Sequence, residues 1–151
     1  MAGSMSAKGH QNENLGMIEI ISHDHAIVAI IVHKSHHTEG IDFITPKEFP
    51  LQLGYMSRPA GYQVEPHIHN QVYRETTATQ EILFIKSGVI RVDFFSIDQI
   101  YLESRELSAG DMILLAGGGH GITVLEDAAI IEVKNGPYLP EADKKRFQAE
   151  R

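Results

Sequence analysis

Two histidines one residue apart, His67 and His69, are the side chains of this sequence best placed by type and spacing to do chemistry. They stand in the stretch GYQVEPHIHN, residues 61–70, which is expected to form a β-strand. Side chains alternate between the two faces of a strand, so both imidazoles would point to the same side, with Ile68 opposite. A neutral imidazole binds a divalent cation through a ring nitrogen at about 2 Å. The pair therefore predicts part of a metal site that other strands must complete.

Two residues further along the chain are the best candidates to complete this site. Glu81 opens the apolar run EILFIKSG, where a carboxylate is costly unless it is paired or coordinated. His120 follows three glycines in LLAGGGHGITV, and glycines allow tight backbone conformations and close approach. The expected metal ligands are therefore His67, His69, Glu81 and His120.

The order of these residues resembles the first sequence motif of the cupin family, whose members are small β-barrels of the jelly-roll class. That motif consists of a glycine, five residues, His-x-His, a spacer, a glutamate and, after six more residues, a glycine. Eleven residues stand between His69 and Glu81, whereas three or four are usual, so Glu75 is a rival ligand. We prefer Glu81, because its distance from the next glycine fits the motif. The matching residues are Gly61, His67, His69, Glu81 and Gly88.

The second cupin motif runs glycine, five residues, proline, one residue, glycine and then a histidine. Residues 110–120 resemble it approximately, with Ala116 in place of the proline and the histidine one residue early. The positions concerned are Gly110, Ala116, Gly118 and His120. The resemblance spans about residues 61 to 125 and implies a jelly-roll barrel around a divalent transition metal, which is Fe, Mn, Ni or Zn.

Short runs rich in Ile, Val and aromatic residues recur along the chain between turn residues, which predicts an all-β barrel or sandwich. Ser87 and Gly88 separate two such runs and are expected to form a hairpin turn. Only the last residues, 140–151, have a helical pattern, because Pro140 suits a first helical position and the basic residues come late. The expected fold is an all-β, cupin-like jelly-roll β-barrel with a short C-terminal helix.

Composition limits the class of protein. The chain has 151 residues, which suggests a single domain, expected at residues 17–151. Residues 1–16 are polar and rich in Gly and Ser, and are expected to be a disordered tag or leader. It has no cysteine, so disulfides and thiolate metal sites are excluded. The net charge of −7, without a basic patch, argues against nucleic acid and membrane surfaces as partners. No signal peptide and no apolar stretch of about 18 residues is present, so we expect a cytoplasmic protein.

Three further residues could contact a substrate. Gln63 has the same strand parity as His67 and could face the interior of the barrel. Tyr73 lies in the long spacer, which could form a lid over the mouth of the barrel. Arg91 interrupts an apolar strand and could bind an anion, although the outer face of the sheet would suit it equally. For Gln63 and Tyr73 an exposed loop without function is the alternative.

Three histidines and one carboxylate leave one or two positions open on a six-coordinate ion, and these can take water or a substrate oxygen. The resemblance implies a metal-dependent enzyme of the oxygenase or the isomerase type. Its substrate would be a small hydroxylated or anionic molecule, with a sugar-like molecule suggested by the association of similar cupins with carbohydrate metabolism. The alternative is a non-catalytic protein that binds or senses a sugar. A homodimer is also expected, in which the apolar run 26–32 would be an edge strand that a second copy covers.

Overall fold

The computed structural model describes residues 17–140 and 142–150, so the leader expected at residues 1–16 lies outside the described part of the chain. This part is all-β, as expected, and contains no helix that is long and apolar enough to cross a membrane. The strands are β1 (Ile18–His23), β2 (Ala26–Val32), β3 (Gly40–Phe43), β4 (Gly54–Ser57), β5 (Glu81–Phe95), β6 (Tyr101–Ser108), β7 (Met112–Leu115) and β8 (Gly119–Lys134).

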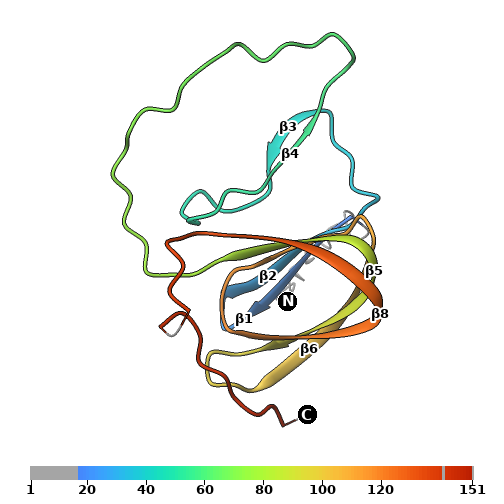
Figure 1. Cartoon of the computed structure of the whole chain (residues 1–151), viewed down its shortest axis with the longest axis vertical. Helices are drawn as coiled ribbons and strands as arrows, with labels where there is room; N and C mark the ends of the chain where they lie inside the picture. Colours follow the sequence, from blue (N-terminus) through green and yellow to red (C-terminus); the bar gives the residue numbers. More distant parts are fainter. Residues whose placement is uncertain (1–16, 141, 151) are drawn as a thin grey trace, which may run out of the picture.

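β5 is the central strand of the six-stranded main sheet, whose order is β1-β2-β7-β5-β6 with β8 also paired to β5. Ile82 pairs both with Leu114 of β7 and with Val133 of β8, so the two edges of β5 are filled. Along one edge of β5, residues 81–84 pair with β7 and residues 89–95 pair with β6. Three long antiparallel tracks, β8, β5 and the β6–β7 pair, thus form a sheet that curls strongly into a half-barrel (Figure 1).

The hairpin turn expected at Ser87 and Gly88 is wrong, because β5 continues through both residues. The pairing of β5 with β8 shifts register on either side of Ser87, which marks a β-bulge, and bulges bend a strand. Gly88 has a φ of 79°, and a Cβ there would collide with the carbonyl oxygen of Asp127 and lie 2.7 Å from Cα of Ala128. The glycine therefore permits a sharp bend with β8 close alongside, and the chain does not reverse.

The core lies on both faces of β2. Ala29 and Ile31 belong to the larger cluster inside the curl, whereas Ile30 and Val32 belong to a second cluster. The second cluster includes Leu53 and other apolar residues of the segment 44–53, which joins β3 to β4. β2 also pairs with β1 on one edge and β7 on the other, so the sequence-based expectation of an edge strand at residues 26–32 is wrong. The expected homodimer itself stays a prediction.

The C-terminal helix expected at residues 140–151 is also wrong, since the described residues of this range form no helix. The backbone N–H of Asp143 donates to the carbonyl of Leu139 (2.9 Å), which is a single turn. Beyond it the ring of Phe147 packs edge-on against Phe95, with ring centroids 5.2 Å apart. So short a helix is marginal on its own, and these tertiary contacts outweigh its local preference.

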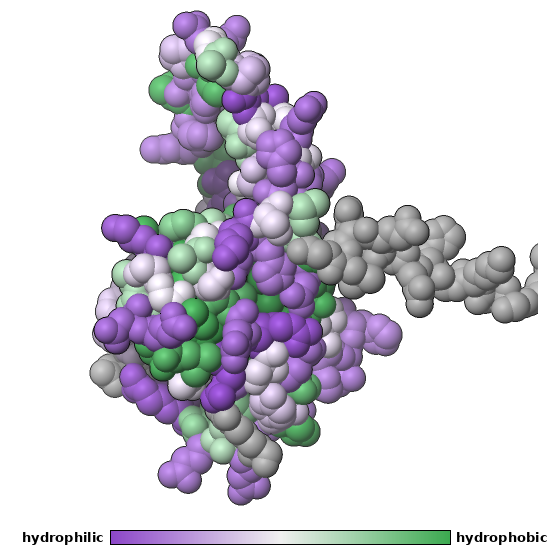
Figure 2. Space-filling view, turned by 90° about the vertical axis from the view of Figure 1, so that its right-hand side faces the viewer, coloured by the Kyte–Doolittle hydropathy of each residue, from purple (hydrophilic) through white to green (hydrophobic). Residues whose placement is uncertain are grey.

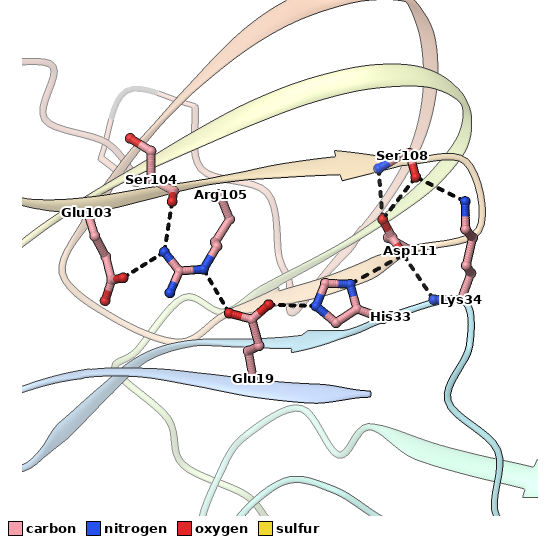
Figure 3. Close-up of polar contacts among 8 residues, drawn as sticks. All are labelled: Glu19, His33, Lys34, Glu103, Ser104, Arg105, Ser108 and Asp111. Atoms are coloured by element: carbon pink, nitrogen blue, oxygen red, sulfur yellow. Dashed lines mark hydrogen bonds and ion pairs between the residues drawn. The ribbon is translucent and has the colours of Figure 1, made fainter. Parts of the chain in front are cut away.

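A chain of polar contacts connects β1, β6 and the turn before β7 (Figure 3). Glu19 accepts hydrogen bonds from Arg105 Nε at 2.7 Å and from His33 Nε2 at 2.7 Å. The other ring nitrogen of His33 lies 3.6 Å from Oδ1 of Asp111. The hydrogen bond from Arg105 is the main cause that lowers the pKa of Glu19 from 4.5; burial opposes it, and His33 lowers the pKa further. The folded structure therefore favours the ionised Glu19.

This shift makes stability depend on pH. The folded pKa of Glu19 lies below its unfolded value, so its contribution to stability is complete above the unfolded value and is lost as the pH falls through the folded one. We expect the free energy of unfolding, measured with urea, to fall as the pH is lowered below 4.5, the unshifted pKa, and to fall less in the Glu19→Gln variant. The same pH dependence in both proteins would contradict the assignment.

The bend in β5 can be tested with two glycines of similar conformation. Gly61 has a φ of 85° but nothing within 4 Å of its virtual Cβ, so Gly61→Ala should cost only backbone strain of about 1 kcal/mol. Gly88→Ala adds a collision with the backbone of β8 and should cost at least about 3 kcal/mol. Urea unfolding of both variants measures the difference, and equal losses would mean that β8 does not crowd the bend.

Candidate functional site

Glu81 and His120 come together at one end of the curled sheet. In the ladder between β5 and β8, Glu81 is opposite Lys134 and His120 is opposite Phe94, at the other end of the same ladder. Despite this separation His120 Nε2 lies 3.4 Å from Glu81 Oε2. Only a strong curl can bring the two ends of the ladder so close, so the bend in β5 builds this part of the site.

The carboxylate of Glu81 is buried, with 9% of the residue exposed, and it faces two nitrogens. Besides His120, Lys134 Nζ lies 3.7 Å from Oε1. The contact with His120, although long for a hydrogen bond, is the main cause that lowers the pKa of Glu81 from 4.5. Burial opposes this shift, while the charges of His120, Lys144 and Lys134 add to it. Glu81 is therefore ionised at neutral pH in spite of its burial.

Lys134 is surrounded by carboxylates. Its Nζ lies 3.5 Å from Glu132 and 3.6 Å from Asp143, in addition to the contact with Glu81. Desolvation would lower the pKa of Lys134, but the three carboxylates outweigh it and the pKa is raised. The ammonium group also lies 4.9 Å from the ring centroid of Tyr138. Lys134 thus balances negative charge at the site and stays protonated.

A cavity of about 690 Å³ opens beside Glu81 and His120. Its walls include the glycine loop 117–119, the C-terminal residues 143–147 and Ala149. Gly119 allows this closeness, since a Cβ there would lie 3.1 Å from the ring of Phe147. The volume is in the range of small-molecule binding sites. Glu81 and His120 are thus positioned to meet a ligand in this cavity.

His67 and His69 lie elsewhere, on a segment that we call the arm, residues 58–80. Every residue from 58 to 79 is exposed, and the arm arches away from the main sheet (Figure 1). In the space-filling view, apolar and polar side chains alternate over the upper lobe that carries it (Figure 2). The two imidazole rings are 5.2 Å apart, and His67 Nδ1 donates to the carbonyl of Glu65 at 2.9 Å.

The strand expected at residues 61–70 is wrong, since no regular secondary structure forms there. No ladder in the structure includes these residues, and Pro66 has no N–H to donate. Residues 17–140 and 142–150 contain no group of three or more His, Asp or Glu side chains arranged to hold a metal ion. The structure instead shows two pairs, Glu81 with His120 and His67 with His69. That they act together as ligands stays a prediction, as does the choice of Glu81 over Glu75, which is also on the arm.

The three expected substrate-binding residues are also divided between the arm and the main sheet. Gln63 and Tyr73 are on the arm and exposed. Arg91 is on β5, where its Nε donates to Asp93 (3.1 Å) and its Nη2 donates to Thr123 (3.4 Å). Asp93 and Thr123 both line the cavity, so Arg91 supports its wall from behind.

The arm is clamped where it rejoins the sheet, immediately before Glu81. The side-chain oxygen of Asn135 accepts a hydrogen bond from the backbone N–H of Gln80 at 2.8 Å. The amide nitrogen of Asn135 donates to the carbonyl of Ala78 at 3.0 Å. Sequence reasoning did not identify Asn135, and nothing in its surroundings VKNGP marks it as more than a turn residue.

Sequence reasoning also missed the residues that close the cavity from the C-terminal side. The sequence predicts a helix at residues 140–151, but Asp143 instead accepts a hydrogen bond from Thr79 at 2.6 Å. The charge run EADKKR was the available signal. The path of the chain here depends on the contacts of Asp143 with Thr79 and of Phe147 with Phe95, which are distant in sequence.

The order of influences on Glu81 can be tested by substitution. Because the contact with His120 lowers its pKa most, we expect His120→Ala to raise the pKa of Glu81 more than Lys134→Ala does. NMR titration of the Glu81 side-chain carboxyl carbon measures the pKa directly in both variants. A larger rise in the Lys134→Ala variant would show that the ammonium, and not the imidazole, keeps Glu81 ionised.

Comparisons with protein-family models, with curated proteins and with solved structures found no match to this chain. The resemblance to cupins thus depends on the residues and spacings of the two motifs. The function is inferred below from the side chains of the site.

Proposed function

We propose that this protein is a cupin-like jelly-roll metalloprotein that acts as a metal-dependent enzyme on a small hydroxylated molecule. The observation that carries the proposal is the Glu81–His120 contact of 3.4 Å on the wall of a cavity of about 690 Å³. Buried carboxylates are costly, and this one is not neutralised by a single tight ion pair. A cation between Glu81 and His120 would contact the carboxylate more closely than the nitrogens of His120 and Lys134 do, at 3.4 and 3.7 Å, and would bring the site into contact with a ligand.

The chemistry of the two side chains fits such a cation. Metal ligands must be deprotonated, and the lowered pKa of Glu81 keeps its carboxylate ionised. A nitrogen and oxygen ligand set without thiolates suits Fe(II), Mn(II), Ni(II) or Zn(II). The sequence contains no cysteine, so a softer site is not available.

His67 and His69 are proposed to complete the set by movement of the arm. Eight residues, 70–77, stand between His69 and the clamp at Ala78, and a tether of this length can span up to about 29 Å. The arm carries exposed apolar side chains, among them Ile68 at 90% and Tyr73 at 86% exposure. Packing the arm over the open end of the sheet would bury such surface, which favours the movement.

When bound, the metal would polarise a substrate oxygen or bind dioxygen, which corresponds to the isomerase and oxygenase types of reaction. The protein itself supplies orientation and charge. Lys134 holds Glu81 on the side away from His120, and Arg91 fixes Asp93 in the cavity wall. The tail forms part of the cavity wall. A cytoplasmic location and a homodimer, both expected from the sequence, belong to this proposal.

A second candidate function is non-catalytic binding or sensing of a small sugar-like molecule. It is favoured by the observation that residues 17–140 and 142–150 gather no group of three or more metal-ligating side chains. In this case Glu81 and His120 would hydrogen-bond to ligand hydroxyl groups directly. Saturable sugar binding to metal-free protein, without turnover, would support it.

Metal binding is tested on protein purified without chelator and reconstituted with Mn²⁺ or Zn²⁺. We expect one ion per chain by elemental analysis, and at least about a tenfold loss of affinity in each of Glu81→Gln, His120→Ala and His67→Ala. His37→Ala is the matched control, because His37 is exposed and its Nδ1 contacts only Tyr55 Oη, at 3.3 Å. Its affinity for metal should not change.

Glu75→Gln decides between the rival carboxylates. A loss of metal affinity in this variant, with full affinity in Glu81→Gln, would show that Glu75 is the ligand and Glu81 is not. No stoichiometric metal in the reconstituted wild-type protein would contradict the metalloenzyme and leave the binding protein as the better proposal.

A further inference from the structure

One wall of the cavity that Glu81 and His120 line is basic. It is formed by the tail, residues 142–150, in which Lys144, Lys145 and Arg146 all line the cavity. We call these three residues the basic triplet. Their side chains are exposed, and among residues 17–140 and 142–150 none of them forms a close ion pair, although the charge of Lys144 acts on Glu81 at longer range. Three adjacent unpaired cations stand out in a chain whose net charge is −7.

The tail is fixed on both sides of the basic triplet. On one side the carboxylate of Asp143 accepts the hydrogen bond from Thr79 and lies 3.6 Å from Lys134. On the other side Phe147 packs at an interplanar angle of 87° against Phe95. With both neighbours anchored on the sheet, the backbone of the triplet is held along the cavity.

The carboxylates that line the cavity are already compensated. Glu81 is next to His120 and Lys134, Asp93 is bound by Arg91, and Asp143 is next to Lys134. Neither Lys134 nor Arg91 lines the cavity itself. The cations that remain available to a ligand are therefore those of the basic triplet. Partly enclosed charge of one sign concentrates ligands of the opposite sign.

We propose that the cavity binds a small molecule with a carboxylate or phosphate group, which the basic triplet holds while the rest of the molecule lies toward His120. A cavity of about 690 Å³ has room for a sugar-sized anion. The orientation toward His120 rests on the proposed function. Recognition of the anionic group by the triplet does not require a metal.

The experiment uses the full chain freed of metal by a chelator and then dialysed. Isothermal titration calorimetry at low ionic strength compares glucose, gluconate and glucose 6-phosphate, which share a hydroxylated skeleton and carry no charge, a carboxylate or a phosphate. At least one of the two anions should bind about tenfold tighter than glucose, as expected for charge-assisted hydrogen bonds. The tighter of the two identifies the group. Added salt should reduce the preference, because the triplet is exposed.

Two variants locate the binding. Lys144→Gln/Lys145→Gln/Arg146→Gln should lose the preference for the anion. The control Lys47→Gln/Arg58→Gln/Lys86→Gln makes the same change of charge at exposed positions that do not line the cavity, and should keep it. Phe147→Ala keeps every cation but removes the anchor of the tail, and should weaken anion binding severalfold. Circular dichroism checks that each variant keeps the wild-type strand content.

Equal binding of glucose and both anions by the wild-type protein would overturn the proposal. So would a preference that survives in the triplet variant. These outcomes are independent of the proposed metal site, which is tested by metal stoichiometry. Loss of metal binding with intact anion preference would overturn only the metalloenzyme.

Discussion

β5 bends at Gly88 while its backbone stays paired with β8, and the rest of the structure depends on this bend. Without it the ladder between β5 and β8 would be a long ribbon, with Glu81 and His120 at opposite ends. The bend is possible because Gly88 has no side chain where β8 passes closest, beside Asp127. The curl then encloses the core and forms the open end at which the cavity lies. A single backbone conformation thus links the stability of the sheet to the geometry of the site.

The sequence predicted well those features that depend on local pattern. The Ile- and Val-rich runs that become β1 and β2 are strands, and the chain is all-β in its described part. Glu81 and His120 were selected because a carboxylate at the head of an apolar strand and a histidine after glycines both need a reason. They lie next to each other, although 39 positions separate them in the chain. Their role as ligands was inferred from type and spacing, which the structure does not test.

The failures have a common physical cause. At Ser87-Gly88 a turn and a bulge have the same local composition, and the course of β8 decides between them. At the C-terminus the helical pattern is weak, and the contact of Phe147 with Phe95 overrides it. Local sequence does not predict this contact. Alternation at residues 61–70 indicates a strand only if another strand pairs with it. In each case the deciding contact is with a residue far away in the sequence. The same is true of the tail, whose position in the cavity wall depends on contacts with distant residues.

The clamp that Asn135 forms on Gln80 and Ala78 has a mechanical consequence for the arm. It separates a long tether from the strand that begins at Glu81, because both hydrogen bonds hold the last residues of the tether to the end of β8. A displacement of the tether would therefore not shift the buried carboxylate of Glu81. In the proposed metal site, two of the ligands would thus be on a movable tether and the other two on a rigid sheet.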